Sequence, residues 1–303
     1  MEKEYLLRKL NKVEQFATTS KTGRLLSNPF RYLSSLFFRE FIYRRNKQER
    51  IREVNLFWDR KMQVALPAST DIYLAGGKTH DSEIRLTRFL IRNLDQGDNF
   101  LDIGAHYGFF TLLAAALTGN TGHIDSFEPA AKSFALLQAN TRDLPQVAIR
   151  QQAVSDTAEP VTFYQFPNLF SEYNSMDVDQ FSGETWFSEF QPEKTTVTAT
   201  TVDQLVQETG RVPKIIKIDV EGGEYQVLKG GVQLLTAHSP IIAMEHLEAA
   251  RHNEKHQEAV NLLRQLGYQS YIITAQGGQE AITDINAYLT GNKMESDNII
   301  FRK

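Results

Sequence analysis

The chain has 303 residues, of which 41% are hydrophobic and 23% charged, and it contains no cysteine. This composition is typical of a globular protein with one large or two smaller domains, and it excludes disulfides, thiolate catalysis and thiolate-bound zinc. The net charge of −4 hides an asymmetry, because residues 1–60 hold 14 Lys/Arg against 7 Asp/Glu while the remaining residues hold 19 against 30.

The N-terminal segment has the pattern of helices. Residues 1–16 and roughly 30–60 are predicted to be helical, with a break at the "SNPF" of residues 27–30. The start lacks the apolar core of a signal peptide, and no apolar run reaches the ~18 residues of a transmembrane helix. The sequence therefore predicts a cytoplasmic protein.

Residues 24–52 combine eight Arg/Lys and two Glu with twelve large apolar side chains. At about 100° per residue, Phe37 and Phe41 share one side of a helix and Phe38 and Ile42 the opposite side. A solvated single helix would not be apolar on two sides. Three partners stay open: the body of the chain or a second copy in a homo-oligomer, a membrane surface or lipid-linked substrate, and nucleic acid, which the acidic body disfavours. We expect residues 1–70 to form a basic, aromatic helical arm.

Residues 71–80 are predicted as a short strand and a turn, and residues 81–94 as a helix with Asp81 as its N-cap. From residue 99 the pattern alternates between strands and helices. Strands are expected over residues 99–104, 122–129, 146–156, 213–222 and 239–246, an antiparallel hairpin within 160–200, and two antiparallel strands near the C-terminus. This alternation predicts an α/β domain over residues 71–303, with a mostly parallel sheet and helices on both faces.

Acidic or polar residues end five of these strands. They are Asp102, Glu128, Asp156, the pair Asp219 and Glu221, and the pair Glu245 and His246. In open sheets of this type, ligands bind beyond the carboxyl ends of the strands. The sequence therefore predicts a binding site lined by carboxylates at one edge of the sheet.

The first turn after a strand reads G-A-H-Y-G, from Gly104 to Gly108. Its glycines allow the backbone to approach a ligand, but the spacing departs from the G-x-G-x-x-G of dinucleotide folds. Glu128 lies 24 residues after Gly104, where a carboxylate can accept hydrogen bonds from both ribose hydroxyls. The pattern favours an adenosine-like ligand without a phosphate clamp, although a plain turn and a plain strand exit remain alternatives.

Several motifs resemble the FkbM-type family of S-adenosylmethionine-dependent methyltransferases. They are "FLDIGAHYGFFTLLAA", "SFEP", "AVSD", "TTVDQL" and "IIKIDVEGGEYQVLKGG". The resemblance runs from about residue 71 to the C-terminus. It implies a Rossmann-like class I methyltransferase fold with a seven-stranded sheet, and methyl transfer to a hydroxyl of a sugar, glycan or natural product, or in some relatives to nitrogen in a peptide or amide.

The resemblance also implies roles for individual residues. Asp102, Gly104, Ala105 and Gly108 would line the methionine end of the cofactor, Glu128 would hold the ribose, and Ser155 and Asp156 would lie by the adenine. His106 departs from the family pattern, which commonly has Asn at this position.

A hydroxyl acceptor must lose its proton to a positioned base. Asp219 and Glu221 are the first candidates and Glu245 the second, whereas Glu224 fits the role of a helix cap. A second hypothesis places Mg²⁺ or a similar cation on Asp219, Glu245 and His246, where it would lower the pKa of the acceptor hydroxyl.

The aromatic, polar segment 164–187 is predicted either to cover the acceptor, with Tyr173, Asn174 and Ser175 as contacts, or to be a surface hairpin. Two functions from other classes also stay open. One is a nucleotide-cofactor oxidoreductase, which the G-A-H-Y-G turn disfavours, and the other is a non-catalytic scaffold.

Overall fold

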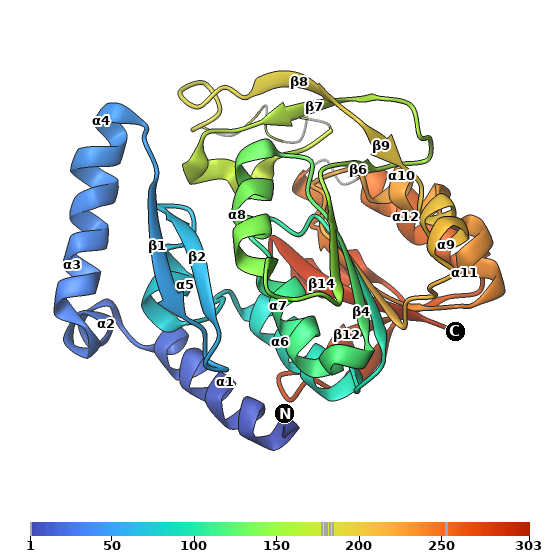
Figure 1. The fold of residues 1–303 in the computed structure, drawn as a ribbon, viewed down its shortest axis with the longest axis horizontal. Helices are drawn as coiled ribbons and strands as arrows, with labels where there is room; N and C mark the ends of the chain where they lie inside the picture. Colours follow the sequence, from blue (N-terminus) through green and yellow to red (C-terminus); the bar gives the residue numbers. More distant parts are fainter. Residues whose placement is uncertain (1, 177, 179–180, 182, 184, 252–253) are drawn as a thin grey trace.

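The computed structural model describes residues 2–176, 178, 181, 183, 185–251 and 254–303. In this part of the chain, an eight-stranded sheet lies between layers of helices (Figure 1). Its strands in spatial order are β13 (Gln279–Ile282), β12 (Gln269–Ile273), β14 (Ser296–Arg302), β11 (Ile241–Leu247), β10 (Ile215–Ile218), β3 (Asn99–Ile103), β4 (His123–Phe127) and β5 (Val147–Arg150).

The predicted mostly parallel sheet is confirmed. Strands β11, β10, β3, β4 and β5 pair in parallel, while β14 is antiparallel to both of its neighbours, β11 and β12. Strand β13 adds an eighth strand at the edge, antiparallel to β12. The order reverses between β3 and β10, so the carboxyl ends of these two strands form the switch point at which such sheets bind ligands.

The buried strand sequences explain why helices cover both faces of this sheet. In the register of β3 and β10, Phe100 pairs with Ile215 and Leu101 with Ile216, and the two pairs enter separate hydrophobic cores because successive side chains point to opposite faces. One core includes α1 (Lys3–Thr18), α6 (Asp81–Asn93) and α7 (Phe109–Thr118). The other includes α9 (Val202–Thr209), α10 (Glu224–Lys229), α11 (Val232–Ala237), α12 (Glu254–Gln265) and α13 (Ile285–Asn292). Helix α8 (Ala131–Thr141) packs on β5 and on the N-terminal hairpin.

The N-terminal region is partly as predicted. Helices α2 (Lys21–Ser27) and α3 (Pro29–Phe37) meet at the predicted break, where Asn28 caps α3 and proline takes its first position. A π-helical turn, η1 (Phe38–Tyr43), and α4 (Arg44–Asn46) continue the rod. The predicted helix does not extend to residue 60, however, because β1 (Arg50–Asn55) and β2 (Lys61–Leu66) form an antiparallel hairpin with the inward side chains of β2 buried.

Two further local predictions were wrong. Residues 71–80 do not begin as a strand, because α5 (Thr70–Ala75) is a helix that Gly76 ends in the left-handed conformation, at φ +70°. Asp81 is not an N-cap, since His80 precedes α6 and Asp81 pairs with Arg85 one turn later, 2.9 Å away.

The region between β5 and β10 confirms the predicted hairpin. Strand β7 (Val161–Gln165) pairs antiparallel with β8 (Glu193–Val197), and the short strands β6 (Ala153–Val154) and β9 (Ala199–Thr200) pair in parallel. The predicted strand 146–156 is therefore split into β5 and β6. Short 3-10 helices are η2 (Gly119–Thr121), η3 (Asn168–Tyr173) and η5 (Ala249–Arg251). Among the described residues, no helix has the length and apolar character needed to cross a bilayer.

Candidate active site

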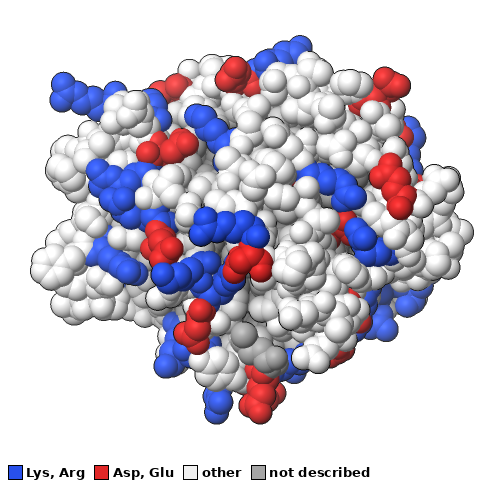
Figure 2. Space-filling model, viewed as in Figure 1, with Lys and Arg blue, Asp and Glu red and all other residues white. Residues whose placement is uncertain are grey.

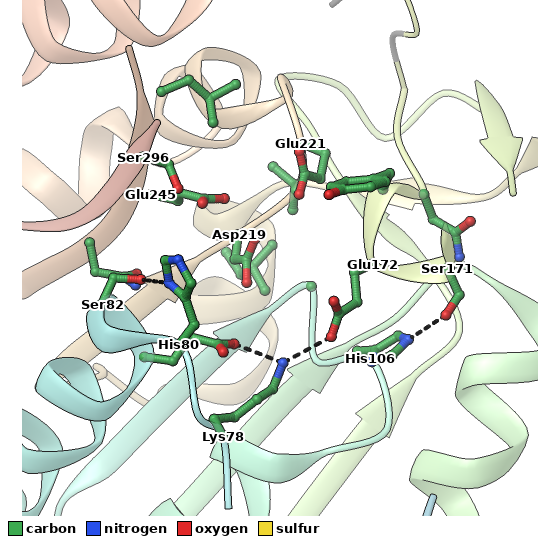
Figure 3. A pocket seen from close by; sticks show the side chains of 18 of the residues that line it. Lys78, His80, Ser82, His106, Ser171, Glu172, Asp219, Glu221, Glu245 and Ser296 are labelled. Atoms are coloured by element: carbon green, nitrogen blue, oxygen red, sulfur yellow. Dashed lines mark hydrogen bonds and ion pairs between the residues drawn. The ribbon is translucent and has the colours of Figure 1, made fainter. Parts of the chain in front are cut away.

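A cleft of about 1020 Å³ opens at the carboxyl ends of the central strands (Figure 3). One wall is formed by the ends of β3 and β4 and by β6, and the other by the ends of β10 and β11 together with the segment before α6 and the turn η3. Its polar lining residues include Asp71, Lys78, His80, Ser82, Glu83, His106, Glu128, Gln152, Glu172, Tyr173, Asn174, Asp219, Glu221, Glu245, Arg251 and Ser296.

The glycines of the first turn are required by packing. Gly104 has φ +79°, and a Cβ added there would lie 1.8 Å from the carbonyl oxygen of Asp219 at the end of β10. Gly108 has φ +91°, and a Cβ there would lie 2.6 Å from Leu137 of α8. Glycine is needed at both positions because the turn is held between these two elements with positive φ angles.

The predicted residues of this turn do not all face the cleft. Gly104 lines it, whereas Asp102, Ala105 and Gly108 are absent from the described lining. Asp102 is fully buried beneath the turn and accepts a 2.6 Å hydrogen bond from the Thr111 hydroxyl. These three residues therefore support the conformation of the turn and do not contact the cleft.

Glu128, at the end of β4, is buried and faces the cleft. Its two carboxylate oxygens accept hydrogen bonds from the backbone N–H groups of His106, at 2.8 Å, and Ala130, at 2.9 Å. Burial raises the pKa of Glu128 to about 7, although these two hydrogen bonds oppose the shift. Each oxygen keeps a further lone pair, so the carboxylate can accept hydrogen bonds from two hydroxyl groups of a ligand.

The rest of this wall is uncharged and mostly apolar. Its described lining residues are Ile103, Gly104, Phe127, Pro129, Gln152, Ala153 and Val154. Because they include no Lys or Arg, this wall fits a nucleoside better than a phosphorylated ligand. Ser155 and Asp156 lie just beyond the lining, and Asp156 forms a 2.7 Å ion pair with Lys229.

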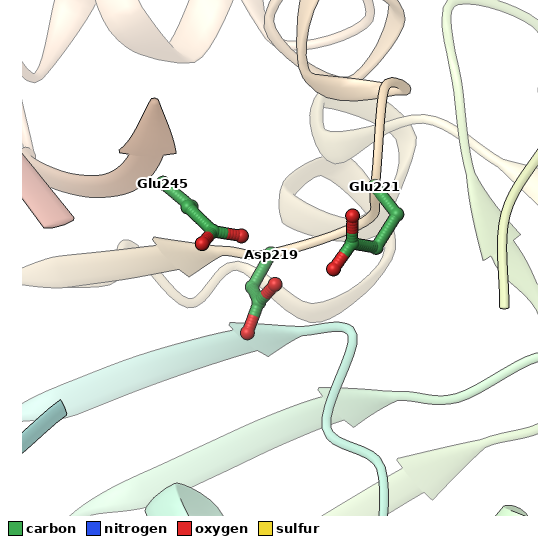
Figure 4. Close-up of side chains that lie close together, drawn as sticks. All are labelled: Asp219, Glu221 and Glu245. Atoms are coloured by element: carbon green, nitrogen blue, oxygen red, sulfur yellow. The ribbon is translucent and has the colours of Figure 1, made fainter. Parts of the chain in front are cut away.

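Asp219, Glu221 and Glu245 form an acid cluster on the opposite wall. Each offers a carboxylate oxygen, and these atoms all lie within 4.8 Å of one another (Figure 4). Burial, and then the charge of Asp219, raise the pKa of Glu245 to about 8. Burial and the charge of Glu245 raise the pKa of Glu221 well above its usual range. The cluster therefore holds at least one proton at neutral pH and can exchange it.

Two neighbours of the acid cluster have other roles. Glu224 is buried and accepts hydrogen bonds from the backbone N–H groups of Val220 and Gly222, at 3.4 and 3.0 Å, so it stabilises the turn before α10. His246 follows Glu245 on β11 and points to the other side, where its Nε2 atom lies 2.9 Å from the amide nitrogen of Gln257 on α12. His246 therefore does not join Asp219 and Glu245, and Glu221 is the third member of the cluster instead.

Lys217, which was not among the predicted site residues, lies below the floor of the cleft. Its ammonium group donates to the Gly104 carbonyl at 3.0 Å and lies 3.4 Å from Asp102 and 3.3 Å from Asp219. Burial alone would lower the pKa of Lys217, but the two carboxylates outweigh this and raise it. The signal was a single lysine within the buried strand "IIKI", because a buried ammonium group needs a charged partner.

A second charged group in the cleft was also missed. The Lys78 ammonium group pairs with Glu83 at 2.7 Å and with Glu172 at 3.0 Å, and His80 lies beside them (Figure 3). Glu172 lies 94 positions after Lys78 in the sequence, so no local motif brings these two residues together.

The segment 164–187 contributes to the same wall. Tyr173 and Asn174 line the cleft, and the Ser175 hydroxyl donates to the Glu221 carbonyl at 2.5 Å. The His106 ring lies 3.0 Å from the Ser171 hydroxyl, and burial lowers the pKa of His106 to about 4. Residues 177, 179–180, 182 and 184 of this segment lie outside the described residues.

Comparison with known proteins identifies relatives of the sheet domain. A model of the methyltransferase FkbM domain matches residues 102–270, which is more than half of the chain. The hexuronic acid methyltransferase AglP of Haloferax volcanii is 26% identical over 168 residues. This match covers 52% of the chain and 60% of the length of that relative.

Solved structures with a similar fold include a methyltransferase FkbM from Methylobacillus flagellatus, at 14% identity and a TM-score of 0.44, covering 78% of this chain and 53% of that one. Another is fibrillarin from Aeropyrum pernix with bound S-adenosyl-L-methionine, at 11% identity and a TM-score of 0.40, covering 72% and 74%.

Proposed function

The chain belongs to the FkbM methyltransferase family. From this premise we propose that it is an S-adenosylmethionine-dependent methyltransferase that methylates a hydroxyl group of a sugar or glycan. The observation that carries the proposal is the pairing, in one cleft, of a carboxylate suited to a ribose with an acid cluster suited to a hydroxyl proton. Family membership also selects methyl transfer over the oxidoreductase alternative.

The cofactor would lie along the wall formed by β3, β4 and β6. Glu128 would accept hydrogen bonds from the ribose hydroxyls, and Gly104 would give the backbone close access. Residues 152–154 would lie by the adenine, with Ser155 and Asp156 behind them. When bound, S-adenosylmethionine supplies a methyl group activated by its sulfonium centre.

The acid cluster would accept the proton of the acceptor hydroxyl. We assign this role first to Glu245, because a base works best when its pKa lies near the working pH, and its pKa is about 8. Asp219 is held by the Lys217 ammonium group and keeps the pKa of Glu245 raised. Glu221 would share the proton with Glu245, since the charge of Glu245 raises the pKa of Glu221.

The proposed acceptor class follows from the lining of the cleft and from the relative named for hexuronic acid methylation. Polar groups from Lys78, His80, Asn174 and Arg251 are suited to hydrogen bonding with a polyhydroxylated ligand. An amide nitrogen in a peptide is the alternative acceptor, and a natural-product hydroxyl would use the same base.

The test is transfer of a labelled methyl group from S-adenosylmethionine to a panel of uronic acid glycosides, neutral glycosides and peptides. We expect a methyl ether on a sugar hydroxyl, identified by mass spectrometry of the product. The E245Q variant should lose the transfer, whereas E258Q, at an exposed position of α12, should keep it. Methylation of the peptides alone would reject the sugar acceptor.

A chelator distinguishes proton transfer from a cation mechanism. Activity that survives EDTA supports Glu245 as a base. Activity that disappears with EDTA and returns with Mg²⁺ would assign Asp219, Glu221 and Glu245 to cation binding and overturn the assignment of Glu245.

A further inference from the structure

The rod formed by α3, η1 and α4 has one side that packs on the molecule and one that does not. On the inner side, Phe38 and Tyr43 are buried in a small core with Leu66 and Phe190. The Tyr43 hydroxyl also accepts a 3.0 Å hydrogen bond from the backbone N–H of Leu169, at the start of η3. The apolar side chains on the inner side of the rod are therefore buried against the rest of the molecule.

The outer side carries a continuous apolar stripe. It consists of Leu26, Phe30, Leu33, Phe37 and Phe41, which are 77%, 86%, 55%, 56% and 67% exposed. Leu26 lies in α2, just before the break at Asn28. The other four residues follow one another at a spacing of three or four residues along one side of the rod, where the Phe37 and Phe41 rings stack with centroids 5.2 Å apart. Single exposed apolar residues are normal, but a contiguous row of this kind marks an interaction surface.

Exposed basic side chains surround the stripe, mainly at its C-terminal end. They are Arg31, Arg39, Arg44, Arg45, Lys47, Arg50 and Arg52. Figure 2 shows Lys and Arg side chains over the left part of the molecule, beside the largely uncharged edge where α3 lies. Residues 24–52 hold eight Arg/Lys and two Glu, so the surface is strongly cationic as well as apolar.

This combination selects among partners. A second copy would bring the same cationic surface against itself in a symmetric dimer, and the like charges would repel. Nucleic acid would match the charge but would leave the row of aromatic and aliphatic side chains in water. An anionic lipid surface matches both features, because basic groups contact the headgroups while the apolar side chains enter the interface.

We propose that the outer side of residues 26–52 docks this protein on an anionic lipid surface. Leu26, Phe30, Leu33, Phe37 and Phe41 insert into the interface, and the basic residues at the end of the rod contact the headgroups. The rod also supports η3, which carries Ser171, Glu172 and Tyr173 into the cleft, so docking would hold the cleft close to the lipid surface.

The experiment is co-sedimentation of the full chain with vesicles of phosphatidylcholine alone or mixed with phosphatidylglycerol. We expect binding to the mixed vesicles that falls as salt is raised, since exposed charges are screened. F37S/F41S should lower the partition coefficient at least roughly tenfold, because the inserted apolar area is lost. R44E/R45E should lower the partition coefficient on the mixed vesicles by about tenfold or more, because the attraction to the anionic headgroups is lost.

Control measurements distinguish docking through this surface from a nonspecific effect of net charge and from misfolding. R302E changes an exposed basic residue of β14, near the C-terminus that Figure 1 shows on the opposite side of the molecule from α3, and should bind vesicles as the unchanged protein does. All variants should keep their melting temperature, because the changed side chains are exposed. Failure of the unchanged protein to sediment with the mixed vesicles would overturn the proposal. So would a concentration-dependent dimer that F37S/F41S abolishes, which would identify a second copy as the occupant.

Discussion

Glu128 and Glu245 lie on opposite walls of one cleft, and burial raises the pKa of both, but their neighbours differ. Glu128 is buried but held by two backbone N–H groups, which keep its carboxylate in place. Glu245 is buried beside Asp219, whose charge makes a second negative charge unfavourable. On the proposed function, one wall would therefore recognise the cofactor and the other would exchange a proton.

The sharpest test of this division is E245Q. Removing a general base typically lowers the rate by about 10²–10⁴-fold, and we expect a loss of about 10³-fold in kcat on a hydroxyl acceptor. The affinity for S-adenosylhomocysteine, measured by calorimetry, should change by less than about threefold, because Glu245 belongs to the other wall. If affinity fell as steeply as turnover, the two walls would not be separate.

Lys217 connects the two walls, and K217M should act on stability. Its ammonium group is buried between Asp102 and Asp219, so its removal leaves two carboxylates without their shared partner. Breaking a buried ion pair in this way costs about 3–5 kcal/mol. We expect a clear fall in melting temperature by calorimetry, whereas K194M, at an exposed position of β8, should leave it unchanged. Equal melting of both variants would show that Lys217 has no structural role.

E128Q tests the recognition wall. A neutral amide can accept only through one oxygen, and its NH₂ group would face one of the donors that Glu128 now accepts from. Losing a charged hydrogen-bond acceptor costs about 1.5–3 kcal/mol, so the affinity for S-adenosylhomocysteine should fall about 10- to 100-fold. Q152E is the matched variant, because it changes the charge of another residue on the same wall but leaves the Glu128 carboxylate in place. Unchanged affinity of E128Q for S-adenosylhomocysteine would show that Glu128 does not bind the ribose.

The two walls also differ in how far the sequence predicted them. The first turn and Glu128 lie within one βαβ unit, so strand ends and spacing were sufficient to place them together. Asp219, Glu221 and Glu245 were predicted as strand ends, although not as a cluster with shared protons. Lys78 and Glu172 were missed, because their contact depends on how the segment before α6 and the turn η3 meet across the cleft. His246 was placed with Glu245 although adjacent strand residues face opposite sides.

The N-terminal region shows the same limit. Its helical start and the break at Pro29 followed from local signals, whereas the β1–β2 hairpin did not. The predicted helix over 50–60 failed because pairing between the two strands, and burial of Met62 and Val64 beneath α8, override a local helical pattern. Assignment of residues 1–70 as a separate arm remains a proposal.

The smallest expected effect concerns the pH dependence of ligand binding on the recognition wall. With a pKa of about 7, Glu128 is mostly protonated at pH 6 and mostly ionised at pH 8. The ionised form accepts hydrogen bonds from two hydroxyls, so affinity for S-adenosylhomocysteine should rise about three- to tenfold over this range. In E128Q this rise should be absent, which separates titration of Glu128 from titration of the ligand.

Titration of Glu128 should have the opposite effect on the stability of the protein without ligand, which should fall as the pH rises. Because the pKa of Glu128 is higher in the folded state than its usual value of 4.5, the folded state binds more protons between about pH 4.5 and 7. Its contribution to stability is therefore present at the acidic end and is lost as pH rises towards 7. Melting curves should show a smaller fall over this range in E128Q than in the unchanged protein. A steeper fall in E128Q would mean that the backbone N–H groups of His106 and Ala130 outweigh burial, and that the carboxylate is ionised throughout.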